Sequence, residues 1–126
     1  MLFSVHLADL SARDALSVLG AQRRLHDAPG LVFGVAMLAV PLRSSSGPPL
    51  PDPHRVGVIA AWRDGDSHER FLAENPIAAR LAGGFRVALE PLRVWGAWPD
   101  AGPIPAGDHA DDDAPVAAIT LGRLRL

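Results

Sequence analysis

Residues 55–98 read RVGVIAAWRDGDSHERFLAENPIAARLAGGFRVALEPLRVWGAW, and this stretch decides the fold. Residues 55–62 form a mostly apolar run that predicts a strand. After an acidic turn, apolar residues recur at helical spacing and predict a helix that Pro76 interrupts or restarts. Gly83-Gly84 ends this helix, and alternating apolar residues predict a second strand over 85–98. The stretch is therefore predicted to be a strand–helix–strand unit.

Polar residues predict where the helical segments of this unit begin. Asp66 is predicted as the N-cap of the helix because Glu69 follows three residues later, as in a capping box. Asn75 before Pro76 fits a cap followed by the first residue of a new turn. Pro91 cannot donate a hydrogen bond to a sheet, so we expect a bulge or a sheet edge there.

The N-terminal part repeats the strand–helix–strand pattern. Residues 2–10 alternate between apolar and polar or small side chains and predict a half-buried strand. Ser11 is predicted to cap a helix that runs to about His26. Residues 31–40 predict a second strand, and residues 43–54 predict a loop because they are rich in proline and lack a period.

The predicted order β-α-β-β-α-β is that of the ferredoxin-like fold, an α+β unit with both helices on one face of an antiparallel sheet. We expect the large apolar residues Phe3, Val5 and Leu7 to face the helices. The opposite face then carries smaller and polar residues, namely Ser4, His6, Ala8, Arg86 and Glu90. That face needs a cover, and the usual cover is a second sheet from a partner chain or from a second repeat, so we expect a homodimer.

Composition excludes several classes of function. The chain of 126 residues has a formal net charge of −2 and a pI near 6.2, which gives no case for binding nucleic acid. It has no cysteine, so disulfides and thiolate chemistry are excluded. Lysine and tyrosine are also absent. No apolar run is long enough for a transmembrane helix, and the N-terminus does not resemble a signal peptide, so we expect a soluble cytoplasmic protein.

The last segment of the chain resembles its first strand. We divide the sequence into a ferredoxin-like domain over 1–99, a Pro/Gly/Asp-rich linker over 100–115 and a predicted strand over 116–126. VAAITLGRLRL aligns thinly with LFSVHLADLSA at the N-terminus, so the last segment is either the first strand of a second repeat or an extra strand at the sheet edge.

Two segments together resemble the first half of the spheroidene monooxygenase-like proteins of the dimeric α/β-barrel superfamily. They are VGVIAAWRDGDSHERFLAENPIAARLAGGFRVALEPLRVWGAWP and PVAAITLGRLRL. The shared features are a strand ending in Trp62 before an acidic turn, a helix carrying Pro76 with Ala79-Arg80, and the closing segment VALEPLRVWGAW. The chain departs from the family because it ends where a second βαββαβ unit would begin.

The resemblance implies a monooxygenase that inserts oxygen into an apolar substrate, such as a polyene or a polycyclic compound. It implies haem as a cofactor if the chain follows the carotenoid-oxidising members. Relatives in the superfamily include cofactor-free monooxygenases of antibiotic biosynthesis, and these imply no cofactor. A non-catalytic truncated or assembly domain is the third alternative.

His6 is the leading candidate for a catalytic residue and for a cofactor ligand. On the strand face that we expect to line the superfamily's cavity, it would ligate haem iron or transfer a proton near neutral pH. The alternative is an idle, hydrogen-bonded histidine at a sheet interface.

Arg86 and Glu90 are the other catalytic candidates, on the same expected face as His6. Arg86 would also hold a haem propionate or a substrate carboxylate, although a solvated or mutual ion pair is the alternative. Trp62 is a candidate for lining the cofactor or substrate pocket, together with Trp95 and Trp98, or else these are core or interface residues.

No metal site is predicted. His26, His54 and His68 lack the spacing of metal motifs. The acidic run DHADDD at 108–113 fits a solvated linker better than a cation site.

Overall fold

The elements follow one another in the order predicted from the sequence. In the computed structural model, which describes residues 1–40, 50–96, 102–105, 107 and 115–120, four strands and four helices are formed. The strands are β1 (Leu2–Asp9), β2 (Leu31–Leu38), β3 (Arg55–Trp62) and β4 (Phe85–Leu89). The helices are α1 (Ala12–Gly20), α2 (Gln22–His26), α3 (Gly65–Glu74) and α4 (Pro76–Leu81).

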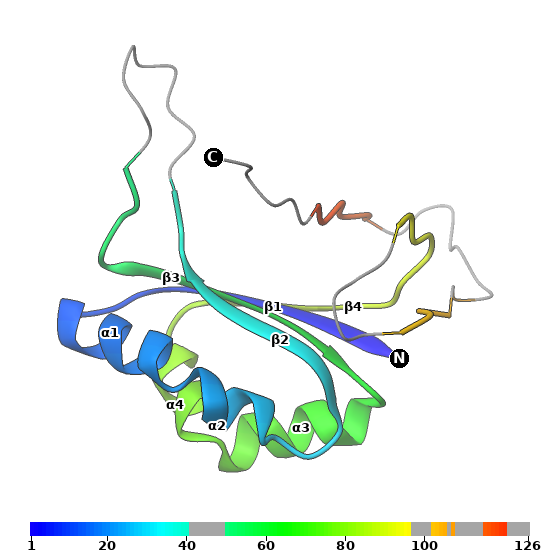
Figure 1. Cartoon of the computed structure of the whole chain (residues 1–126), viewed down its shortest axis with the longest axis horizontal. Helices are drawn as coiled ribbons and strands as arrows, with labels where there is room; N and C mark the ends of the chain where they lie inside the picture. The colour runs from blue at the N-terminus through cyan, green and yellow to red at the C-terminus, as the bar shows by residue number, and fades with distance from the viewer. Residues whose placement is uncertain (41–49, 97–101, 106, 108–114, 121–126) are drawn as a thin grey trace.

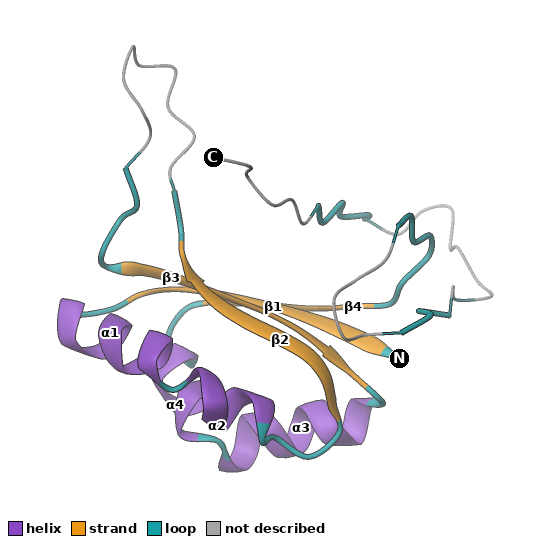
Figure 2. Cartoon of the chain, viewed as in Figure 1, coloured by secondary structure: helices purple, strands orange, loops and turns teal. Residues whose placement is uncertain are grey.

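The strands form one antiparallel sheet in the order β2-β3-β1-β4. The four helices lie on one side of it (Figures 1 and 2). This arrangement is the predicted ferredoxin-like fold. At the outer edge of β2, the Gln22 amide of α2 donates to the Gly34 carbonyl and accepts from the Ala36 N–H, both at 3.1 Å. Gln22 therefore satisfies part of an edge that would otherwise be open to another strand.

Local capping explains where the helices begin, with one correction to the prediction. Ser11 caps α1 and Asn75 caps α4, where Pro76 is the first helical residue, as predicted. The cap of α3 is Asp64, whose Oδ1 accepts from the Ser67 N–H at 2.8 Å, so the prediction of Asp66 was wrong. Asp64 fits because the extended chain leaving β3 presents its carboxylate to the first turn.

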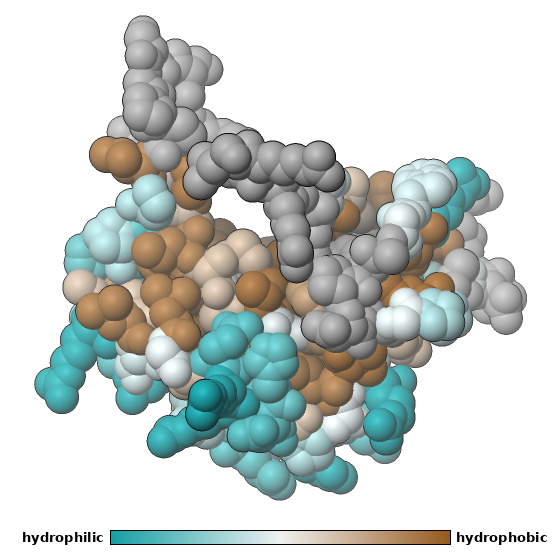
Figure 3. Space-filling view, viewed as in Figure 1, coloured by the Kyte–Doolittle hydropathy of each residue, from teal (hydrophilic) through white to brown (hydrophobic). Residues whose placement is uncertain are grey.

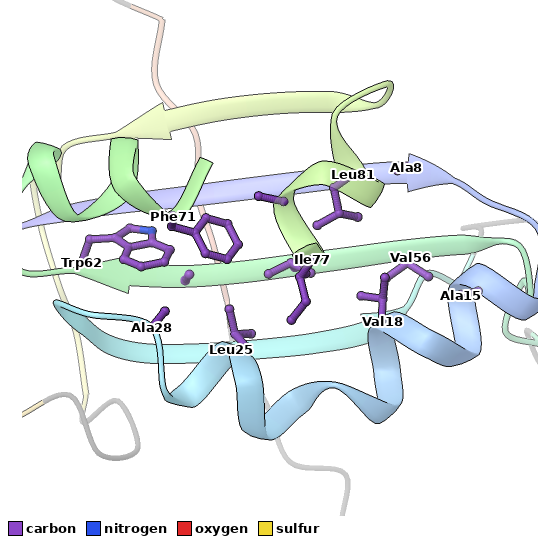
Figure 4. Close-up of a cluster of buried hydrophobic side chains, with 13 residues drawn as sticks. Ala8, Ala15, Val18, Leu25, Ala28, Val56, Trp62, Phe71, Ile77 and Leu81 are labelled. Atoms are coloured by element: carbon purple, nitrogen blue, oxygen red, sulfur yellow. The ribbon is translucent and has the colours of Figure 1, made fainter. Parts of the chain in front are cut away.

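The prediction of which side of the sheet meets the helices was also wrong. Ser4, His6 and Ala8 face the helices: Ala8 belongs to the buried core, Ser4 is hydrogen-bonded to Trp62, and the ring of His6 contacts that of Phe71. Small side chains suit this side because large ones already fill the space from the helices and from Trp62 (Figure 4). Since side chains alternate along a strand, Phe3, Val5 and Leu7 point to the other side.

The side of the sheet away from the helices is apolar on every strand. We call it the open face. It consists of Phe3, Val5 and Leu7 on β1 and of the residues on the other strands that lie in register with them. They are Phe3, Val5, Leu7, Phe33, Val35, Met37, Gly57, Ile59, Ala61, Phe85, Val87 and Leu89. Figure 3 shows hydrophobic residues in a band above the polar surface of the helices. Polar residues were expected on this face, and the pairing places Arg86 on the opposite one.

The last predicted strands are shorter or absent. β4 ends at Leu89, before Glu90 and Pro91, so the predicted strand over 85–98 is confirmed only in its first part. Residues 116–120 belong to no strand in the described part of the chain, so the predicted strand over 116–126 is not seen over that range. A short apolar run forms a strand only if its backbone can hydrogen-bond to the edge of a sheet. Most residues of this run are exposed to solvent. Residues 121–126 lie outside the described residues.

Candidate active site

His6 lies at the centre of β1 and is almost completely buried, with 2% of its surface exposed. Its ring centroid is 6.0 Å from that of His68 and 6.1 Å from that of Phe71, both on α3. Among the described residues, its Nε2 atom has no hydrogen-bond partner. A buried polar atom normally has one, so this nitrogen is a candidate for contact with a ligand.

The wall behind His6 is aromatic. His68 and Phe71 project from the same side of α3, and Trp62 at the end of β3 contacts both, with ring centroids 5.7 Å and 4.8 Å away. The Trp62 Nε1–H donates to the Ser4 Oγ at 2.9 Å in a buried hydrogen bond. This bond fixes the indole ring, and the ring in turn limits where the two imidazoles can lie.

Both buried histidines are held in the neutral form. Burial lowers the pKa of His6 to about 4, with further lowering from the positive charges that His68 and Arg86 can carry. Burial and Arg86 also lower the pKa of His68, which the carboxylate of Glu69 partly opposes. At pH 7 each ring therefore has one N–H donor and one bare nitrogen acceptor.

A pocket of about 230 Å³ lies beside His6. Arg86 of β4 pairs with His6 across the two strands and provides the charged part of the pocket wall. The rest of the wall comes from α3, α4 and the turn after them: Leu72, Ala78, Leu81, Ala82 and Gly84. The site is thus a small pocket in which a neutral imidazole and an exposed guanidinium lie next to each other.

Gly84 allows the strand that carries Arg86 to lie against β1. A Cβ atom at this position would lie 2.3 Å from the Leu7 carbonyl oxygen and 2.7 Å from the Ala8 Cβ. Both are fixed parts of β1, so any side chain would displace the start of β4. The glycine that was predicted as a helix stop therefore also positions Arg86 opposite His6.

The structure brings together some of the predicted site residues and separates others. His6 and Arg86 share the pocket, and Trp62 reaches the same cluster through His68. Glu90 is exposed beyond the end of β4 and does not line the pocket. Trp95 is 83% exposed, and Trp98 lies outside the described residues. Trp95 therefore contributes nothing to this pocket.

His68 and Ser4 are the site residues that the sequence interpretation missed. A helical period places His68 on the same side as Phe71 and Leu72, and this pattern is the signal that could have found it. The other histidines have local partners: His26 contacts the Gln22 amide, and His54 contacts the Leu10 carbonyl oxygen. Within the described residues no three His, Asp or Glu side chains gather as metal ligands, and the acidic run 108–113 falls outside that part of the chain.

The pocket does not fit a haem. Its volume of about 230 Å³ lies below the ~300–1,000 Å³ of pockets for drug-sized ligands, and a porphyrin with its iron is a large member of that range. The buried Nε2 of His6 is a suitable iron ligand by chemistry, but His68 and Phe71 stand within ring contact of it. This pocket is therefore too small for the macrocycle.

Sequence comparison connects the chain with a known oxygenase. Over 81 residues it is 33% identical to spheroidene monooxygenase of Cereibacter sphaeroides; the match spans 61% of this chain and 25% of that protein. The resemblance seen in the sequence is thereby confirmed, over about a quarter of the relative's length. No family model matches the chain.

Comparison with solved structures confirms the fold. A protein from Deinococcus radiodurans, assigned to the antibiotic biosynthesis monooxygenases, superposes with a TM-score of 0.55 at 12% identity, covering 78% of this chain and 99% of that one. SnoaB, a cofactor-independent oxygenase from Streptomyces nogalater, gives a TM-score of 0.46 at 19% identity, covering 78% and 95%. At 12% identity, the superposition on the Deinococcus radiodurans protein shows a shared fold. In the described part of the chain, no helix has the length and apolar character needed to span a membrane.

Proposed function

We propose that the chain is a monooxygenase that oxidises a compact, electron-rich substrate beside His6 and Arg86, without a resident haem. The observation that carries this proposal is the juxtaposition, in one small pocket, of a guanidinium and a buried, neutral imidazole whose Nε2 has no hydrogen-bond partner among the described residues. The sequence similarity to spheroidene monooxygenase supports the class of reaction. The small size of the pocket argues against an extended polyene as substrate.

The chemistry would begin with removal of a proton. His6 accepts the proton of an acidic phenol or enol, and Arg86 stabilises the oxyanion that remains. Because its pKa is about 4, His6 is a weak base, so the transfer depends on Arg86 holding the anion. Replacing Arg86 should therefore impair the reaction as severely as replacing His6.

The electron-rich anion would then react directly with dioxygen. When a ring methylene is converted to a carbonyl, the carbon gains one oxygen atom and loses its two hydrogens, which leave with the second oxygen atom as water. The substrate supplies all four electrons, so the balance needs no external reductant. The residues Leu72, Ala78 and Leu81 would keep water away from the anion.

The proposed assembly is a homodimer, in which the open faces of two sheets meet. Exposed apolar surface marks interaction sites, and Leu7 and Phe85 are exposed on the side of the sheet that has no helices. The pocket opens on the other side of the sheet, so its lining comes from one chain. We place the protein in the cytoplasm and assign it no nucleic-acid partner, as its charge and composition suggest.

The proposal is tested by oxygen uptake with a hydroxylated anthrone as substrate. The wild-type protein should consume one dioxygen per carbonyl formed, while His6→Gln and Arg86→Gln should lose activity by about 100-fold or more. His54→Gln is the matched control, because His54 is an exposed histidine away from the pocket. Equal rates in all four proteins would contradict the proposal.

A haem titration separates the two kinds of oxygenase. We expect no Soret band when hemin is added to the purified protein and excess is removed. A stoichiometric Soret band that His6→Ala abolishes would instead favour a haem-dependent reaction, as implied by the resemblance to the carotenoid-oxidising proteins, and would overturn the cofactor-free proposal.

A further inference from the structure

Two buried imidazole nitrogens, on neighbouring rings, have no hydrogen-bond partner among the described residues. His6 and His68 are 2% and 6% exposed, and the Nε2 atom of each has no hydrogen-bond partner among the described residues. An unsatisfied buried polar group costs about 1–3 kcal/mol. Because both unpaired atoms lie in one small aromatic cluster, we look for a single partner that satisfies both.

The two rings are neighbours, but they do not satisfy each other. Their centroids lie 6.0 Å apart at an interplanar angle of 65°, and no hydrogen bond joins the two rings. Neighbouring buried polar groups that do not bond to each other are commonly bridged by water, which offers two donors and two acceptors. A neutral imidazole offers one donor and one acceptor, so two of them can hold one oxygen atom from both sides.

We infer that His68 is a positioning residue that acts on His6 through a single bridging water. In this arrangement the His68 Nε2–H donates to the water oxygen, and the water donates one hydrogen to the bare Nε2 of His6. The two histidines are then locked in opposite tautomers. If the Nε2 of His6 carried the hydrogen instead, the water would face two N–H donors, and its own hydrogen would have no acceptor on His6.

The charged groups around the pair favour this neutral arrangement. Arg86 reaches His6 from β4, and its positive charge disfavours protonation of both histidines. Among the described residues, Glu69, next to His68 on α3, is the acidic group that acts on the pair. Phe71 and Trp62 complete the surroundings with apolar ring surface. A proton that arrives at one ring is therefore not retained without a stabilising anion nearby.

The consequence for catalysis rests on the proposed function. The substrate hydroxyl would donate its proton to the bridging water as that water passes a hydrogen to His6, so the water is regenerated and His6 becomes the imidazolium. His68 keeps its own proton and holds the water in line. It does not touch the substrate, which agrees with its absence from the residues that line the pocket.

Nitrogen-15 NMR of the imidazole rings tests the inference on the unmodified protein at pH 7, after treatment with a chelator. The expected result is the Nδ1–H tautomer for His6 and the Nε2–H tautomer for His68. The same tautomer in both rings would overturn the inference. Stoichiometric uptake of Zn²⁺ by the pair, lost in His6→Gln, would also overturn it by identifying a metal site instead.

Variants at His68 provide the second readout. His68→Phe keeps a ring against Trp62 and removes the donor, so the tautomer of His6 should become mixed. In the oxidation assay kcat should fall about 10-fold or more with KM changed less than about 2-fold. His68→Gln returns an N–H donor and should restore part of kcat, and His26→Phe, at an exposed histidine, should change neither quantity. An unchanged His6 tautomer and kcat in His68→Phe would refute the role.

The two proposals fail in different ways. If no substrate is oxidised but the tautomers are opposite and respond to His68→Phe, the proposed function is wrong and the positioning role stands. If oxidation depends on His6 and Arg86 but is indifferent to His68→Phe, the function stands and the positioning role is wrong.

Discussion

At the scale of single residues, His6 couples the stability of the fold to pH. Its pKa is about 4 in the folded protein and near the ordinary value of 6.5 in the unfolded chain. Between these values the unfolded state binds more protons than the folded state, so stability is fully present above pH 6.5 and is lost as the pH falls toward 4. The shift corresponds to at most about 3 kcal/mol, and the lowered pKa of His68 acts in the same direction.

We therefore predict that the free energy of unfolding decreases between pH 6.5 and pH 4.5 in urea titrations. His6→Phe, which keeps a ring between Phe71 and His68, should flatten this decrease, while the exposed-site variant His54→Gln should retain it. The carboxylates with lowered pKa values, Asp9 and Asp64, titrate below this window, so they do not obscure the result. A slope that is the same in His6→Phe as in the wild type would show that His6 is not the cause.

At the scale of an element, the beginning of α3 decides which of its side chains reach the sheet. Asp64 accepts from both the backbone N–H and the hydroxyl of Ser67, at 2.8 Å and 2.6 Å. With this start, His68 and Phe71 lie on the buried side of the helix. The N-cap is thus a structural requirement of the candidate site as well as of the helix.

We predict that Asp64→Ala lowers the free energy of unfolding by about 1 kcal/mol, the usual cost of losing an N-cap. Asp66→Ala is the matched control, since Asp66 is also acidic and exposed but lies inside the first turn, where it makes no capping bond. Its effect should be smaller, a few tenths of a kcal/mol from the helix dipole. The reverse order in urea denaturation would place the cap at Asp66.

At the scale of the whole molecule, the two sides of the sheet differ in what they contact. The helix side holds the core and the pocket, and the open face presents apolar side chains from all four strands. Phe85 is 61% exposed and Leu7 is 36% exposed on that face. Surface of this kind is buried in most proteins, which is the physical basis for the proposed homodimer.

We predict a dimer in sedimentation velocity at micromolar concentration, and a monomer for Ile59→Arg, which places a charge at the centre of the open face. Circular dichroism should show that the variant keeps its helices and strands. Leu16→Arg is the control, because Leu16 is a 69% exposed apolar residue on α1 and should leave the dimer intact. A monomeric wild type would contradict the proposed assembly.

The sequence by itself determined the first three strands, the start of the fourth and the order of strands and helices, although the helix predicted to run to about His26 is divided into α1 and α2. Period-two alternation predicted β1, and an apolar run rich in β-branched residues predicted β3 with both of its bounds correct. Asn75-Pro76 predicted the junction between α3 and α4. These patterns are local, because hydrogen bonding within a few residues decides them. The sequence also predicted that His6 and Arg86 lie on the same face of the sheet, since both positions follow from the alternation of the strands, but it placed that face away from the helices.

Only the tertiary structure decided which face of the sheet meets the helices. Alternation divides the side chains of a strand into two sets, but it does not show which set faces the helices. In β1 both sets contain residues that can be buried in a core. Large side chains from Trp62, Phe71, Ile77 and Leu81 fill the layer above Ser4, His6 and Ala8, so the small residues turn inward and the large ones turn out. This choice buries His6 beside His68, a contact between residues far apart in the chain that no local pattern encodes.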